Sequence, residues 1–348
     1  MKLGLLVNRI PTELADYSTT HLAMAATALG HEVWYMDTDD LAYDPDESIR
    51  ARAQRTPEGA TDDSAAFLSA VQRGETESQR IAIEDLDVLV LRNDPAEDFL
   101  ERPWARSVGI IFGELAANRG VIVVNDPTGL SKALNKLYFQ HFPPDIRPRT
   151  LVTRDPEEVR AFVASHDGRA VLKPLQGSGG HGVFMIRPED AANLNQMIDA
   201  VARDGYIVVQ EFLPAAEEGD VRIFLMNGRV MEHQGTYAAF RRVRTSSDFR
   251  SNITVGGQPA AAEVTDKMLE VAEAVRPKLV ADGMFLVGLD IAGEKLIEVN
   301  VFSPAGFYSI HQLTGVNFAT DVIDALEKKV RHLQTYSQPF TNAQIAML

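Results

Sequence analysis

Short hydrophobic runs alternate with longer mixed segments over residues 1–125. Runs of strand length predict strands that are buried on both faces, and a longer segment closed by Gly30 is typical of a helix that ends at a glycine. The alternation predicts an open parallel sheet with helices on its faces. We predict strands at 2–8, 31–37, 86–94 and 121–126, with helices at 20–30 and 108–120.

Residues 44–80 interrupt this pattern, because they are mostly polar and charged. Weak alternation at 48–56 and a short helical segment at 64–74 are the structural signals within them. We expect a solvated excursion or a hairpin that leaves the main domain.

A proline-rich segment, residues 142–150, marks a boundary in the middle of the chain. Its prolines favour a rigid connector after a predicted helix at 130–142. Beyond it, strands and hairpins alternate with helices, and we expect residues 335–348 to form a loosely held tail. Strands are predicted at 151–154 and 206–214, and strand hairpins at 222–233 and 285–302. Helices are predicted at 156–166, 189–202, 265–283 and 318–333.

Composition narrows the class of protein. The 348 residues carry a formal charge of −15 and include no cysteine. A negative field repels polyanions, which argues against nucleic acid or an anionic membrane as partner. The lack of cysteine excludes a disulfide, a thiolate nucleophile and a cysteine-ligated zinc. The apolar run before Asn8 is too short for a signal peptide and no run of about 18 apolar residues follows, so we expect a cytoplasmic protein.

Residues 171–186 contain glycines in the spacing GxGxxG, at Gly177, Gly179 and Gly182. A Walker loop needs Lys and Ser or Thr after the last glycine, a dinucleotide fingerprint needs a helix there, and a kinase places its lysine later. Here a strand-forming run follows the glycines, and Lys173 precedes them. Glycine amides can approach phosphate oxygens while a lysine neutralises their charge. By itself, the stretch also fits an ordinary structural turn.

A second informative segment is the predicted hairpin at 285–302. Glu298 and Asn300 lie two apart and therefore on one face of a strand. A two-residue turn places Asp290 opposite Ile297 on the other face, whereas a longer or bulged turn pairs it with Glu298. If the three oxygen side chains converge, they suit Mg²⁺. The alternative is an amphipathic hairpin whose acids point to solvent.

Two further segments are candidates for binding. The strand end from Gln210 to Leu213 offers backbone groups to an adenine edge, and Asp220 and Arg222 begin the next strand. Residues 240–257 form an arginine-rich, glycine-ended loop that is long enough for a mobile lid. A solvated basic loop is the alternative.

These segments occur in a recognisable order: LNKLYF, VLKPLQGSGGHGV, VQEFLP, GDVRIFLMNGRV, RSNITVGG and VGLDIAGEKLIEVNVFSP. In sequence and spacing they resemble the ATP-grasp enzymes, and specifically the bacterial glutathione synthetases, over about residues 1–330. The resemblance implies an α/β ATP-grasp fold. We expect an N-terminal open-sheet domain at 1–127, a small lid domain at 128–213, a C-terminal sheet domain at 214–334 and a tail at 335–348.

The resemblance also implies roles for individual residues. It assigns catalytic roles to Lys173, Arg222, Arg250 and Asn252. ATP binding falls to Lys136, Lys173, Gly177, Ser178, Gly179, Gly180, Gln210, Glu211, Phe212, Leu213 and Asp220. Two Mg²⁺ ions, with Mn²⁺ as a substitute, are assigned to Asp290, Glu298 and Asn300, and substrate to Arg92, Ser303, Gly256 and Gly257.

The chemistry of that family suits a chain without cysteine. A substrate carboxylate attacks the γ-phosphorus of ATP, and an amine then attacks the acyl phosphate to form an amide, so no protein nucleophile is needed. We expect a homo-oligomer, a dimer or tetramer, that joins γ-glutamylcysteine to glycine.

One segment departs from the family pattern, because small and aromatic residues at 305–310 replace polar ones. A ligase for another acyl donor or amine, such as a dipeptide or another γ-glutamyl compound, is therefore one alternative. A non-catalytic ATP-binding protein is the other.

Overall fold

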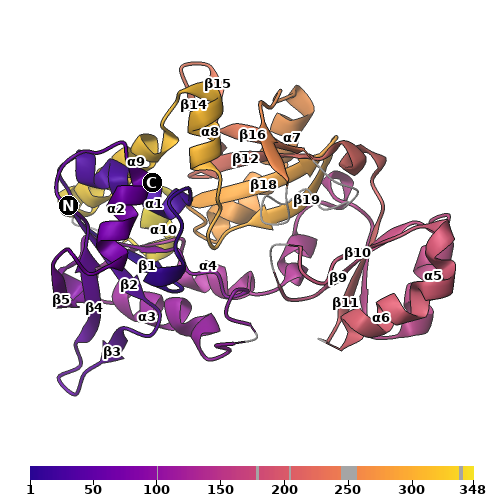
Figure 1. Ribbon diagram of the computed structural model, residues 1–348, viewed down its shortest axis with the longest axis horizontal. Coiled ribbons are helices and arrows are strands. Elements are labelled where there is room, and N and C mark those ends of the chain that lie inside the picture. The colour runs from indigo at the N-terminus through magenta and orange to yellow at the C-terminus, as the bar shows by residue number, and fades with distance from the viewer. Residues whose placement is uncertain (100, 178–179, 204, 244–256, 337–339) are drawn as a thin grey trace.

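The computed structural model describes residues 1–99, 101–177, 180–203, 205–243, 257–336 and 340–348. Figure 1 shows an N-terminal α/β domain, a C-terminal sheet in the middle and a small sheet domain at the far end. The described residues form three larger sheets and one two-stranded sheet, which confirms the predicted α/β fold.

The N-terminal sheet is built on a parallel core. β1 pairs with β2 and β6, and β6 pairs with β7, all parallel as the hydrophobic runs predict. The helices α1, α2 and α3 accompany these strands. The bounds are β1 (Lys2–Val7), α1 (Ser18–Ala28), β2 (Glu32–Asp37), β3 (Leu41–Tyr43), β4 (Ile49–Arg55), α2 (Ser64–Gln72), β5 (Ser78–Ala82), β6 (Val88–Leu91), α3 (Val108–Ala117) and β7 (Ile122–Val124).

The polar region 44–80 contributes to this sheet. β3 and β4 form the expected hairpin, but β4 also pairs antiparallel with β2 and with β5. The N-terminal sheet is therefore mixed, with three antiparallel strands added to the parallel ones. Ile49, Ala51 and Ala53 of β4 are buried while alternate residues are not, so a weak alternation was enough to join the sheet.

The connection between the domains differs from the predicted single helix at 130–142. α4 (Pro127–Lys132) ends early, and a separate 3-10 helix covers Lys136–His141. Asn135 lies between them in an extended conformation and accepts a hydrogen bond from the Leu137 amide with its side chain. A capping asparagine thus restarts the helical turn and sets the direction in which Lys136 leaves the backbone.

The small domain is a four-stranded antiparallel sheet in the order β10, β9, β11, β8, covered by two helices. The glycine-rich stretch connects β9 to β10, which confirms strand, glycine hairpin, strand. The bounds are β8 (Thr150–Thr153), α5 (Pro156–Ala164), β9 (Ala170–Pro174), β10 (Phe184–Ile186), α6 (Leu194–Ala202) and β11 (Ile207–Glu211).

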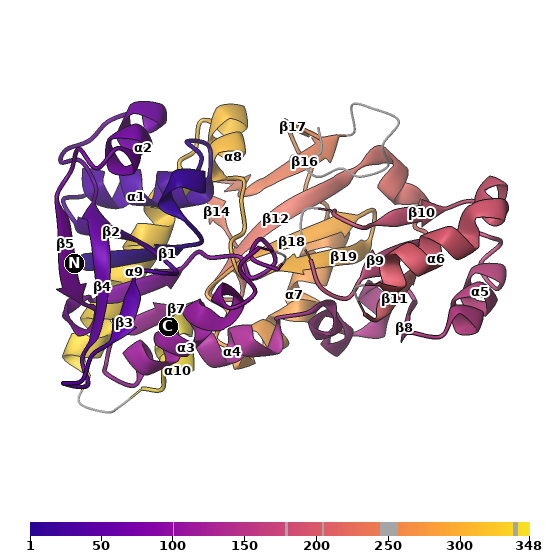
Figure 2. The same ribbon diagram turned by 60° about the horizontal axis from the view of Figure 1, so that its bottom comes forward.

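The C-terminal sheet has the order β17, β16, β12, β18, β19 and is antiparallel, with β13 beside β12. Figure 2 shows this sheet between the N-terminal domain and the small domain. The bounds are β12 (Asp220–Met226), β13 (Arg229–Val230), β14 (Glu232–His233), β15 (Thr236–Tyr237), β16 (Ala239–Val243), β17 (Gln258–Ala260), α7 (Asp266–Ala281), β18 (Leu286–Ala292) and β19 (Lys295–Asn300).

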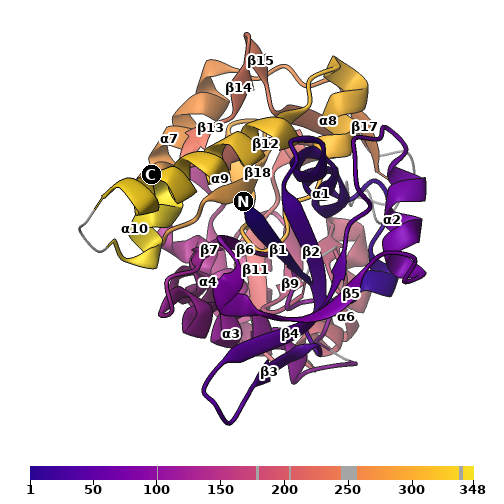
Figure 3. The same ribbon diagram turned by 90° about the vertical axis from the view of Figure 1, so that its left-hand side faces the viewer.

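The last helices return to the N-terminal domain: α8 (Phe307–Thr314), α9 (Phe318–Thr335) and α10 (Asn342–Met347). Figure 3 shows α9 passing beside α1 and β1. The expectation of a loosely held tail is wrong for α10. Asn342 donates to the Val123 carbonyl (2.8 Å) and to Asp126 (2.9 Å), and Ile345 is buried.

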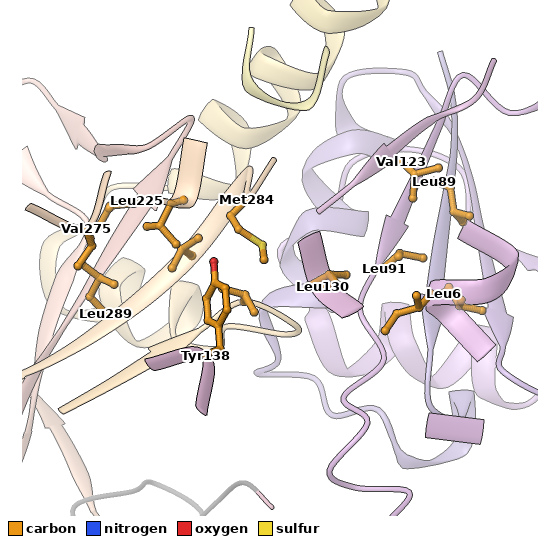
Figure 4. Close-up of a cluster of buried hydrophobic side chains, with 14 of the residues drawn as sticks. Leu6, Leu89, Leu91, Val123, Leu130, Tyr138, Leu225, Val275, Met284 and Leu289 are labelled. Carbon is orange, nitrogen blue, oxygen red and sulfur yellow. The ribbon is translucent and has the colours of Figure 1, made fainter. Parts of the chain in front are cut away.

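One hydrophobic cluster extends from the N-terminal sheet into the C-terminal sheet. In Figure 4, Leu130 of α4 and Tyr138 lie between the leucines of β1 and β6 and the side chains around Leu289. The Tyr138 hydroxyl donates to buried Asp282 (2.9 Å), which also accepts from Lys132 and Lys278. The two domains therefore share a packed core that holds the site's walls together.

Candidate functional site

A cavity of about 280 Å³ lies where the three domains meet. It is lined by residues from β9, β11, β12, β16 and β19, by the 3-10 helix at Lys136, and by the loop after β6. Twelve of the predicted site residues line it: Lys136, Lys173, Gly177, Gly180, Gln210, Glu211, Phe212, Leu213, Asp220, Glu298, Asn300 and Ser303.

The remaining predictions fall elsewhere. Arg92, Arg222, Gly257 and Asp290 are not among the described residues that line the cavity. Ser178, Gly179, Arg250, Asn252 and Gly256 lie outside the described residues.

Two lysines converge on the cavity from different elements, Lys136 from the 3-10 helix and Lys173 from β9. Lys136 donates through Nζ to the Gly177 carbonyl in the glycine-rich stretch (2.6 Å). Burial lowers its pKa to about 8 even though Glu298 attracts its charge. Burial also lowers the pKa of Lys173, against the attraction of Glu298 and Asp290. Both ammonium groups are therefore under-compensated, and a polyanionic ligand would restore their balance.

The strand end predicted to meet adenine is held firmly. Glu211 accepts a hydrogen bond from the Arg149 amide with its side chain (3.0 Å), and Gln210 donates to Thr150 (3.2 Å). The Arg169 guanidinium lies 6.0 Å from the ring centre of Phe212. Since these side chains are occupied, they fix the edge of β11 beside an apolar part of the cavity lined by Val171, Met185, Val208 and Leu213.

The hairpin register resolves the question that the sequence left open. Ala292 pairs with Lys295 across a two-residue turn, yet Asp290 pairs with Glu298, because a bulge intervenes. Ile297 is the extra residue of this bulge. The turn and the bulge occur together, and they put Asp290 and Glu298 side by side on one face of the sheet.

Asp290 is fully buried and bound by arginines. It accepts from Arg222 Nε (2.7 Å) and Nη2 (2.8 Å), from Arg242 Nη2 (2.6 Å) and from Asn300 (3.3 Å). Burial alone would raise the pKa of Asp290, but the two guanidinium groups lower it to about 2. Asp220 also binds Arg242, accepting from Nε (2.9 Å) and from the same Nη2 (2.5 Å).

Arg242 is the main member of this network that the sequence did not identify. Burial lowers its pKa, but Asp290 and Asp220 raise it further, so the side chain stays charged. The sequence did indicate that such a residue exists, because Asp220 begins a strand and a buried carboxylate needs a cationic partner. The partner could not be named because the pairing of Asp220 with Arg242 depends on the register of β12 against β16.

Gly219 brings these two strands together. Its φ is +96°, and a Cβ there would lie 2.0 Å from the Arg242 carbonyl oxygen. Any side chain would therefore force β12 and β16 apart. The glycine before Asp220 is thus a condition for the ion pair between Asp220 and Arg242.

The oxygen ligands fit a magnesium ion in part. Within the described residues, no three acidic or histidine side chains gather into a cluster that could hold a metal alone. Glu298 and Asn300 nevertheless line the cavity, and Mg²⁺ takes few protein ligands beside phosphate oxygens. Asp290 is saturated with N–H donors, so it can join them only after an arginine has moved.

Arg92 connects domains. It is 4% exposed at the end of β6, and it donates to Thr19 Oγ1 (3.1 Å) and to the Pro304 carbonyl (3.1 Å). Burial lowers its pKa to about 10. It thereby positions the chain just after Ser303, which does line the cavity.

The departing segment 305–310 packs against α1. The Gly306 and Phe307 amides donate to Ser18 Oγ (3.0 and 3.2 Å), and Tyr308 stacks on His21 with ring centres 5.3 Å apart. None of these six residues is among those that line the cavity in the described part of the chain.

The fold and this site define the class of protein. Solved structures with a similar fold cover almost the whole chain: the ATP-grasp ligase PsnB (21% identical, TM-score 0.56, 94% of this chain and 98% of that one) and the macrocyclase MdnC from Microcystis aeruginosa (12%, 0.61, 94% and 100%). At these identities they show the fold alone, and that fold is ATP-grasp.

Sequence comparison identifies the family. Residues 1–131 match the N-terminal domain, and residues 135–315 the ATP-grasp domain, of prokaryotic glutathione synthetase. Similar proteins include the glutathione synthetases of Synechocystis (34% identical, 94% of this chain and 100% of that one) and Vibrio parahaemolyticus (29%, 95% and 99%). The chain belongs to the prokaryotic glutathione synthetase family.

Proposed function

We propose that this protein joins γ-glutamylcysteine to glycine at the expense of ATP, through an acyl phosphate. The observation that carries the proposal is the convergence of under-compensated Lys136 and Lys173 on one cavity, opposite Glu298 and Asn300. Full-length similarity to glutathione synthetases supports the identity of the substrates.

In this proposal the lysines bind the ATP phosphates. The Lys136 ammonium, which now binds the Gly177 carbonyl, exchanges that acceptor for a phosphate oxygen, and the glycine-rich stretch approaches with its amides. Burial of both lysines strengthens their attraction to the phosphates, because screening by water is weak there. Gln210 to Leu213 would place adenine at the edge of β11.

Glu298 and Asn300 would hold Mg²⁺, with Asp290 added after its arginine contacts rearrange. When bound, the metal would neutralise charge on the phosphates. Arg242 also lines the cavity, and both Arg242 and Arg222 bind Asp290. If one guanidinium were released from Asp290, that arginine could stabilise the charge on the transferred phosphoryl group. We expect two ions, as the family resemblance implies.

The walls of the cavity would also exclude water from the acyl phosphate, which water otherwise hydrolyses. The donor carboxylate and the amine need positioning rather than a protein nucleophile.

The test is a substrate panel with the purified protein and MgATP. ADP and product are measured for γ-glutamylcysteine, other γ-glutamyl compounds and dipeptides, each with glycine and with other amines. Glutathione with stoichiometric ADP is expected for the first donor with glycine. Turnover with a different pair alone would replace the substrates, and ATP binding without ADP from any pair would replace the enzymatic function.

Two further expectations belong to this proposal. In the described part of the chain, no helix is long and apolar enough to cross a membrane. We propose that the protein works in the cytoplasm, where ATP is available. We also propose a dimer or tetramer, and light scattering at assay concentration would measure its mass.

A further inference from the structure

The N-terminal domain contributes its own wall to the cavity. The loop after β6 and the 3-10 helix Ala105–Ser107 bring Asp94, Phe99 and Arg106 to the cavity surface. Neither Phe99 nor Arg106 was singled out from the sequence. Arg106 contacts Gln176 of the glycine-rich stretch, so this wall adjoins the part of the cavity where the proposed function places the phosphates. The donor must approach the γ-phosphate there, and this wall is placed to contact it.

Arg106 is held in place but not saturated. Its Nη2 donates to Gln176 Oε1 (2.9 Å), and its guanidinium carbon lies 4.9 Å from the ring centre of Phe99. Its Nε is buried and has no hydrogen-bond partner among the described residues. A buried N–H without an acceptor is costly, so a ligand oxygen in the cavity would stabilise this arginine.

A planar guanidinium stacked on an aromatic ring is suited to a carboxylate. Asp94, on the same wall, supplies the opposite charge that an ammonium group needs. An arginine and an aspartate together match the zwitterionic head of an amino acid. Resting on the proposed function, we propose that Arg106 binds the α-carboxylate of the donor's γ-glutamyl group and thereby sets donor specificity.

A neighbouring arginine provides the control. Arg102 pairs with Asp98 through Nε (2.9 Å) and donates through Nη2 to the Asn8 carbonyl (2.8 Å) and to Thr38 (2.8 Å). It is not among the residues that line the cavity. Arg102→Gln therefore removes the same charge from the same segment without removing a donor from the cavity.

The experiment compares two donors. 4-Aminobutanoyl-cysteine is γ-glutamylcysteine without the α-carboxylate. We expect Arg106→Gln to raise KM for γ-glutamylcysteine about 10- to 100-fold, as for loss of a hydrogen bond between charged groups, with kcat nearly unchanged. KM for 4-aminobutanoyl-cysteine and for ATP should not change. Arg106→Lys should recover part of the loss, and Arg102→Gln should leave the ratio of the two KM values at its original level.

The variant Gln176→Ala distinguishes two roles for Arg106: binding the donor, and holding the glycine-rich stretch in place. If Arg106 acted only by holding the glycine-rich stretch through Gln176, this variant would reproduce the effect of Arg106→Gln on both donors. The proposal predicts instead that Gln176→Ala preserves discrimination between the donors.

Three results would overturn the assignment of Arg106: an unchanged KM for γ-glutamylcysteine in Arg106→Gln, an equal rise for both donors, or a rise in KM for ATP instead. No ADP from the original protein with γ-glutamylcysteine and glycine is a distinct outcome. It would refute the proposed function, and the inference with it.

Discussion

The lysines and the arginines around the cavity are all cationic, but they differ in how far nearby carboxylates compensate their charge. Lys136 and Lys173 have lowered pKa values because burial outweighs the acids near them. Arg222 and Arg242 are bound by buried carboxylates, chiefly Asp290, and the pKa of Arg242 is raised. Positive charge that the protein leaves under-compensated indicates where an anion binds, whereas compensated charge holds the scaffold.

Removal of the shared carboxylate tests the arginine side of this comparison and has the largest expected effect. Asp290→Ala leaves Arg222 and Arg242 buried with an acid missing, so the free energy of unfolding should fall by about 3–5 kcal/mol. Urea denaturation measures it. As a control, Glu298→Gln at the cavity surface should change the free energy of unfolding far less. If Asp290→Ala were as stable as the original protein, Asp290 would not have the structural role assigned to it.

Removal of a lysine tests the other side. Lys173→Met should reduce ADP formation roughly 100- to 1000-fold, because a preorganised donor to the phosphates is lost. The same variant should unfold at the same or a higher temperature, since a poorly compensated charge leaves a buried position. Steady-state kinetics and a thermal scan measure the two effects. A large loss of stability would show that Lys173 belongs to the scaffold.

The pH dependence of ATP binding sharpens the comparison. The pKa of Lys136 is about 8 in the ligand-free protein, and bound phosphate would raise it. Above pH 8 a growing fraction of Lys136 is neutral, so ATP affinity should fall, by about tenfold between pH 7.5 and 9.5. Calorimetric titrations across this range measure it. Lys136→Arg stays charged and should give a flatter profile; parallel profiles would exclude Lys136 as the titrating group.

The smallest effect concerns a contact far from the cavity. Asn342→Ala removes the hydrogen bonds that hold α10 to Val123 and Asp126, and should lower the free energy of unfolding by about 1–2 kcal/mol. Chemical denaturation measures it. Asn193→Ala is the control, because Asn193 begins α6 without a side-chain cap bond. Equal effects of the two variants would contradict the docking of α10.

Local patterns predicted much of the fold. The apolar runs identified β1, β2, β6 and β7, and the glycine spacing identified the hairpin between β9 and β10. The docking of α10 was missed because Asn342 and Val123 are 219 residues apart. A short polar segment carries no local sign of a partner at that distance.

The site was predictable where motifs were local. Lys136, Lys173, Glu298 and Asn300 all line the cavity, as the predicted phosphate and metal ligands should. The bulge that pairs Asp290 with Glu298 could only be offered as one of two registers.

Other site features needed tertiary structure. Arg242 depends on the pairing of two strands, and Arg106 meets Gln176 from another domain, 70 residues away. Both residues lie in segments whose pattern fits a solvated surface.

The central claim is that the cavity transfers phosphate from ATP to a carboxylate before an amine attacks. The most direct measurement uses γ-glutamylcysteine labelled with ¹⁸O in the cysteine carboxylate, with MgATP and glycine. The account predicts that labelled oxygen appears in the released inorganic phosphate, because the acyl phosphate breaks between carbon and that oxygen. Glutathione formed with unlabelled phosphate would contradict it.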